Sequence, residues 1–104
     1  MPPDKIPVYT EQFRNDITDV VRYIAFELCN PQAAQSLKDQ LQSEIETIVK
    51  LPLQLKPYFI DEASKDAYYP LYVNNFVAFF VIVGNNYEFR RFLYSKRDLK
   101  STLC

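Results

Sequence analysis

The chain has 104 residues, of which 48% are hydrophobic, and its net charge is −1, which fits one globular domain over residues 1–104. One Gly cannot supply a Gly-rich phosphate loop. Two Cys and no His argue against a zinc site, a disulfide framework and a nucleophile activated by His.

The same composition indicates the compartment. Two cysteines, Cys29 and Cys104, suggest a reducing environment. The N-terminus lacks the apolar region of a signal peptide, and the longest apolar run, Phe76–Val83, is too short for a transmembrane helix. We therefore expect a cytoplasmic protein without a membrane partner and without a cofactor.

The first half of the chain predicts a short strand and two helices. Residues Pro7–Tyr9 are typical of a strand, and Thr10 can cap a following helix. Asn30 and Pro31 are typical of the start of a second helix, which ends at Lys50. Both helices carry one apolar stripe: Phe13, Ile17, Val20, Val21, Ile24 and Leu28 in the first, and Ala34, Leu37, Leu41, Ile45 and Ile48 in the second. Their short connection predicts an antiparallel hairpin.

The second half predicts strands. A Pro-containing loop with room for a short edge strand precedes a strand near Tyr68–Val73. Asn74-Asn75 indicates a turn, and the apolar run Phe76–Val83 is typical of a central strand covered on both faces. Gly84–Asn86 predicts a hairpin turn before a last strand, Tyr87–Tyr94.

The tail predicts a short helix from about Lys96 to Leu103, with Ser95 and Asp98 as a capping box. The expected fold is α+β. It comprises a two-helix N-terminal hairpin packed on one face of a small, mostly antiparallel sheet of three to four strands, and a short C-terminal helix.

Positive charge is concentrated at the C-terminal end. Residues 1–83 hold 7 Lys/Arg and 11 Asp/Glu, whereas residues 84–104 hold 5 Lys/Arg and 2 Asp/Glu. Lys96 and Arg97 would lie in the first turn of the tail helix, where a cation opposes the helix dipole but free N–H groups favour an anion. Contact with a phosphate or a partner carboxylate is therefore most plausible there.

Other residues have structural interpretations beside functional ones. Arg90 and Arg91 should point to opposite faces of their strand, and one of them can pair with a helix carboxylate such as Glu27 or Asp16. Phenylalanines at positions 76, 79, 80 and 89 are expected in the core rather than stacked on bases. Cys29 is expected to be a buried structural thiol.

Three segments together resemble one known family. They are "DITDVVRYIAFELCNPQAAQSLKDQLQSEIETIVKLP", "YVNNFVAFFVIVGNNYEFRRFLYSKRDL" and the terminal "R-x-x-Y-x-x-R-D" pattern within the second. Their order and spacing, over roughly residues 8–103, resemble the RelE/ParE superfamily of toxins from bacterial type II toxin–antitoxin systems.

The resemblance implies a RelE-like fold and a growth-inhibiting toxin, of a class linked to plasmid stabilisation. It also implies one partner, a small antitoxin. RelE-like members are ribosome-dependent mRNA endonucleases (mRNA interferases), whereas ParE-like members inhibit DNA gyrase without being nucleases. Our first expectation is the endoribonuclease, with the ribosome and mRNA as its targets, and the gyrase inhibitor is the alternative.

The resemblance also implies the site. Arg97 matches the catalytic arginine of RelE-like toxins, Lys96 is its neighbour, and Arg91 and Tyr94 match the other polar positions of the pattern. Tyr69 and Val77 stand where related toxins often carry Arg. That difference leaves a third interpretation open, a non-toxic member that retains antitoxin binding.

Overall fold

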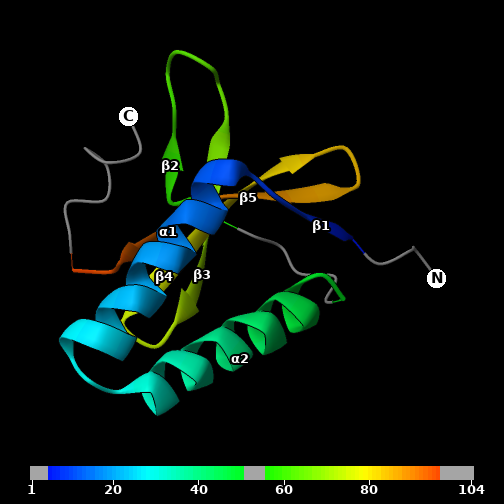
Figure 1. Cartoon of the computed structure of the whole chain (residues 1–104). Helices are drawn as coiled ribbons and strands as arrows, with labels where there is room; N and C mark the ends of the chain where they lie inside the picture. The colour runs from blue at the N-terminus through cyan, green and yellow to red at the C-terminus, as the bar shows by residue number, and fades with distance from the viewer. Residues whose placement is uncertain (1–4, 51–55, 97–104) are drawn as a thin grey trace.

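The structure is a computed structural model that describes residues 5–50 and 56–96 (Figure 1). Within these ranges, three helical elements follow a first strand, and four strands come after them. In order the elements are β1 (Ile6–Tyr9), α1 (Glu11–Arg22), the π-helix η1 (Tyr23–Glu27), α2 (Pro31–Ile48), β2 (Phe59–Ile60), β3 (Ala67–Val73), β4 (Phe76–Val83) and β5 (Asn86–Tyr94).

The strands form one five-stranded sheet in the order β1-β5-β4-β3-β2. β1 pairs parallel with β5, and the other neighbours pair antiparallel. The α+β class and the mostly antiparallel sheet are confirmed, but the expectation of three to four strands is wrong. The sheet gains its extra strand because the N-terminal segment adds to one edge while the two-residue β2 adds to the other.

The predicted helix caps at Thr10 and Asn30 and the helix hairpin are confirmed. Thr10 Oγ1 accepts a hydrogen bond from Phe13 N at 3.1 Å, and Asn30 Oδ1 accepts one from Ala33 N at 3.0 Å. Each cap satisfies a backbone N–H that the first helical turn leaves without an intrahelical partner. Figure 1 shows the two helices joined at one end, with the sheet passing behind α1.

Hydrophobic residues gather on both faces of the sheet. The cluster under the helices contains the buried Phe13 of α1, Phe80 of β4 and Phe89 of β5, together with the apolar stripe of α2. A second cluster includes Val77 and Phe79, whose side chains alternate with those of the first cluster along β4. β4 is therefore covered on both faces, as its continuous apolar run predicts.

A β-bulge shapes the middle of β5. Phe80 lies opposite Phe89 and Phe79 lies opposite Arg91, so Arg90 is the extra residue. Thr10 Oγ1 donates to the carbonyl oxygens of Phe89 at 3.2 Å and Arg90 at 3.4 Å. Thr10, the N-cap of α1, thus supplies a hydrogen-bond donor to backbone carbonyl groups of β5 where the pairing with β1 ends.

Cys29 is exposed rather than buried, because the chain leaves η1 through a left-handed residue at Cys29 (φ 51°) and turns its side chain away from the core. The predicted C-terminal helix, with Arg97, Asp98 and Cys104, falls in 97–104, outside the described residues. Ser95 Oγ donates to the carbonyl oxygen of Asn75 at 2.8 Å.

Candidate functional site

The predicted site residues that the structure describes lie at the end of β5. Tyr94 ends the strand with 39% of its surface exposed, and Lys96 lies in the exposed turn that follows. The backbone N–H of Ser95 donates to Asn75 O at 2.8 Å, which ties this turn to the β3–β4 turn. The fourth predicted residue, Arg97, is not among the described residues.

Arg91 is held by helix α1. Its Nε donates to Asp16 Oδ2 at 2.8 Å, and the carboxylate of Asp16 also accepts hydrogen bonds from the backbone N–H of Phe92 at 3.0 Å and from Gln12 Nε2 at 2.8 Å. Asp16 is the charged residue buried in the described core, with 7% exposure. The alternative that an arginine pairs with this helix carboxylate is confirmed, and Arg91 has a structural role whatever else it does.

Arg90 points the other way and is also neutralised. Its guanidinium contacts the carboxylates of Asp66 at 2.7 Å and Glu88 at 2.8 Å, and it lies 5.7 Å from the ring centroid of Tyr68. Partial burial works against the charged form, but the hydrogen bonds that Arg90 donates to Asp66, Tyr68 and Glu88 outweigh it and raise the pKa of Arg90. Arg90 therefore fastens the β2–β3 turn to β5.

These ion pairs leave less unpaired positive charge near the end of β5 than the sequence alone suggests. Of the cations between Gly84 and Lys96, the two arginines are matched by carboxylates from other parts of the fold. Lys96 has no ion-pair partner within residues 5–50 and 56–96. In the described part of the site, free positive charge is thus reduced to the ammonium group of Lys96, two residues after Tyr94.

Tyr69 and Val77, which stand where related toxins often carry Arg, both make apolar contacts. Val77 is fully buried in the cluster on the far face of the sheet, directly opposite Leu93. The ring of Tyr69 stacks on Phe80 with their centroids 5.7 Å apart. Neither position presents a cation to the end of β5.

A groove of about 700 Å³ opens beside Tyr94. It lies where the end of the first helix, the start of α2 and the β3–β4 turn meet. Its lining residues are Asp19, Val20, Tyr23, Ile24, Leu28, Asn30, Ala33, Asn75, Phe76 and Tyr94. The sequence did not predict this groove, because Val20, Ile24 and Leu28 were all assigned to the buried stripe of the helix.

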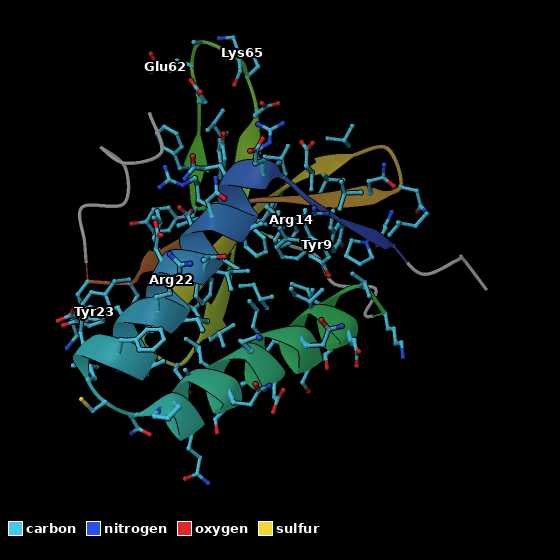
Figure 2. All side chains as sticks on the ribbon, viewed as in Figure 1. Tyr9, Arg14, Arg22, Tyr23, Glu62 and Lys65 are labelled. Atoms are coloured by element: carbon cyan, nitrogen blue, oxygen red, sulfur yellow. The ribbon has the colours of Figure 1, made fainter. Side chains whose placement is uncertain are left out.

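The π-helix η1 explains why this end of the hairpin stays open. A π turn is wider than an α turn and shifts the following side chains around the helix axis. Ile24 still packs against the core, but Leu28 at the end of the apolar stripe leaves it and is 56% exposed. Tyr23 and Phe26 of η1 are also exposed, at 56% and 75%. Figure 2 shows Arg22 and Tyr23 at this end of the helix, remote from Tyr9 and Arg14 at its other end.

A smaller groove of about 200 Å³ lies between the two helices near their other ends. Its apolar wall includes Tyr9 and Phe13, and its charged residues are Arg14 and Lys38. Burial, and secondarily the nearby carboxylate of Glu46, raise the pKa of the Tyr9 hydroxyl. The two grooves thus differ in charge, since Asp19 is the ionisable carboxylate in the larger one.

The described residues contain no group of three or more His, Cys, Asp and Glu side chains placed to hold a metal ion. In the same two ranges no helix is both long and apolar enough to cross a membrane.

Comparison with known families agrees with the predicted resemblance. Residues 8–99 match the sequence profile described as "ParE toxin of type II toxin-antitoxin system, parDE". No curated protein matches the chain. The profile covers the last two residues of β1, the helix hairpin, strands β2 to β5 and the segment with Tyr94, Lys96 and Arg97.

Proposed function

Because the chain belongs to the ParE toxin family of type II toxin–antitoxin systems, within the RelE/ParE superfamily, we propose that it is a toxin that inhibits DNA gyrase and is held inactive by a cognate antitoxin. The family implies the antitoxin partner. The choice of gyrase as the target is our proposal, and it reverses the order of the two targets expected from the sequence.

The Arg91–Asp16 ion pair carries this choice. Cleavage of RNA through its 2′-hydroxyl needs a group that removes a proton, one that supplies a proton and one that stabilises charge on the phosphate. Asp16 holds Arg91 at 2.8 Å, and Val77 fills a position where a cation could have contributed. Binding to gyrase requires a complementary surface, which does not depend on such a set of groups.

Charge supports the same choice. A nuclease that works on the ribosome gains affinity from basic residues that neutralise RNA phosphates. This chain has a sequence pI of about 5.3, and both described arginines of β5 are paired with carboxylates.

The mRNA endonuclease remains the second candidate, because Tyr94 and Lys96 are both exposed at the end of β5. In that mechanism Arg97 and Lys96 would stabilise charge on the phosphate, while Tyr94 and Arg91 would position it or share the proton transfer. The cytoplasm is the expected location for either target.

The deciding experiment treats gyrase and translating ribosomes with the same purified protein. We expect loss of supercoiling of relaxed plasmid, or accumulation of gyrase cleavage complexes, and no new mRNA 5′ ends in the ribosomal A site. New A-site ends with unchanged supercoiling would instead establish the endonuclease. If both assays are negative and induction leaves growth normal, the chain is a non-toxic member that binds antitoxin.

Single substitutions connect this activity to the end of β5. Lys96→Ala and Arg97→Ala should each reduce toxicity, whereas Lys56→Ala, which removes an exposed cation elsewhere, should not. Growth after induction of each variant, at matched protein level, is the measurement. Full toxicity of both β5-end variants would exclude this surface from target binding.

A further inference from the structure

We infer that the groove beside Tyr94 is the docking site of an amphipathic antitoxin segment that fills it with apolar side chains and places a Lys or Arg against Asp19. The inference rests on family membership, which supplies the antitoxin, and not on the choice between gyrase and ribosome. It adds the location and the chemistry of the contact.

The first argument is the apolar surface that the fold leaves open. Leu28 and Tyr23 line the groove with 56% exposure each. Phe26 of η1, outside the lining, is 75% exposed. Large apolar side chains exposed together, rather than singly, mark a binding surface, because their burial against a partner removes apolar area from water. Tyr23 lies on the π-helix η1 and Leu28 directly follows it, and π-helices are often found at functional sites.

The second argument is charge. Asp19 is the charged residue in the lining of the groove, and its carboxylate has no ion-pair partner in residues 5–50 and 56–96. Tyr23 and Tyr94 line the same groove. A carboxylate flanked by aromatic rings suits a basic side chain, which can pair with the carboxylate and lie over a ring.

The third argument is the overlap with the proposed active surface. Tyr94 lines the groove and ends the strand that leads to Lys96. A segment that fills the groove would therefore cover Tyr94 and lie next to the surface through which the toxin would act. Inhibition of the toxin would follow from occupancy, without a conformational change.

The family implies a cognate antitoxin, and the test uses the small protein encoded beside the gene of this chain that co-purifies with it after co-expression. Binding of the parent chain and of two groove variants is compared by calorimetry. Leu28→Ser should raise the Kd by about tenfold, since it removes an apolar contact from the interface. Asp19→Asn should raise it by about fivefold and should weaken its dependence on salt.

Matched controls separate docking from general surface effects. Ile60→Ser removes an equally exposed apolar side chain (54%) from β2, and Asp39→Asn removes an exposed carboxylate from α2. Neither should change the Kd by more than about twofold. Thermal unfolding of each variant verifies that the folded structure is retained.

Several results would overturn the inference. One is parental affinity of both groove variants, and another is failure of the neighbouring gene product to bind the parent chain. A third is a dimer of the chain alone that Leu28→Ser dissociates, since the groove would then bind a second copy. Toxicity of Leu28→Ser without antitoxin is measured separately, so an error about the cellular target leaves the docking result interpretable.

Discussion

The carboxylate of Asp16 lies 2.8 Å from Nε of Arg91 and joins helix α1 to strand β5. The same carboxylate accepts the backbone N–H of Phe92 at 3.0 Å. The buried side chain of Asp16 therefore neutralises Arg91, which belongs to the pattern shared with the family, and it also accepts a backbone hydrogen bond from β5. Removal of this side chain should lower the stability of the fold strongly.

Asp16→Ala should lower the free energy of unfolding by about 3 kcal/mol, because it leaves Arg91 unpaired and a buried N–H without an acceptor. Urea unfolding measures the change. Asp19→Ala, an exposed carboxylate on the same helix, is the control and should cost at most about 0.5 kcal/mol. Equal losses in the two variants would contradict a special role of the Asp16 contacts.

The Arg90–Asp66 pair should make stability depend on acid pH. Hydrogen bonding from Arg90 holds the pKa of Asp66 below its ordinary value of 3.8. A carboxyl with a lowered folded-state pKa adds stability in full above its unfolded-state pKa and loses it as pH falls through the folded-state pKa. Asp66→Asn should thus be less stable than the parent near neutral pH, and the difference should shrink below about pH 4.

Urea unfolding of both proteins at a series of pH values checks this dependence. Glu62→Gln removes another carboxylate from the same β2–β3 turn, where Figure 2 shows it beside Lys65, and it should track the parent at every pH. A difference between Asp66→Asn and the parent that stays constant down to the lowest pH would exclude the ion pair as its source.

Thr10→Ala should destabilise the protein by about 1–2 kcal/mol, since the hydroxyl caps α1 and donates to the carbonyl groups at the bulge of β5. Thermal or urea unfolding reports the loss. Thr10→Ser keeps the hydroxyl and should recover most of it. Thr18→Ala is the control, because the Thr18 hydroxyl bonds only to Arg14 O within α1, and a loss as large as that of Thr10→Ala would argue against the capping role.

Cys29→Gly should stabilise the protein by about 0.5–1 kcal/mol, because Cys29 adopts φ 51°, a conformation that glycine reaches without strain. Its exposed side chain contributes little packing that could be lost. Cys29→Ala keeps the Cβ atom and should bring no gain. A destabilised Cys29→Gly would indicate that the thiol has an unrecognised structural role.

Local patterns in the sequence predict much of this fold. The caps at Thr10 and Asn30, the turns at 74–75 and 84–86 and the strand Phe76–Val83 all depend on residues close together in the chain. Such features follow from backbone preferences and side-chain periodicity. They are confirmed almost residue for residue.

Features that depend on distant residues were harder to predict. The bulge at Arg90 arises from strand register, and the exposed Leu28 arises from the π turn before it. An uninterrupted helical periodicity assigns Leu28 to the core, because nothing in the local sequence signals that the helix widens. The sequence left open whether Arg90 or Arg91 pairs with a helix carboxylate, and whether that carboxylate is Glu27 or Asp16. A sequence does not reveal which carboxylate lies within reach of each arginine.

The parallel pairing of β1 with β5 connects residues 6–9 with residues 86–89. Loop closure between segments so far apart makes the last step of folding slow relative to local helix formation. During translation the sheet cannot close until β5 has been synthesised, so a nascent or prematurely terminated chain lacks the strand that carries Tyr94. A chain that ends before this strand therefore lacks both the parallel partner of β1 and Tyr94, one of the proposed site residues.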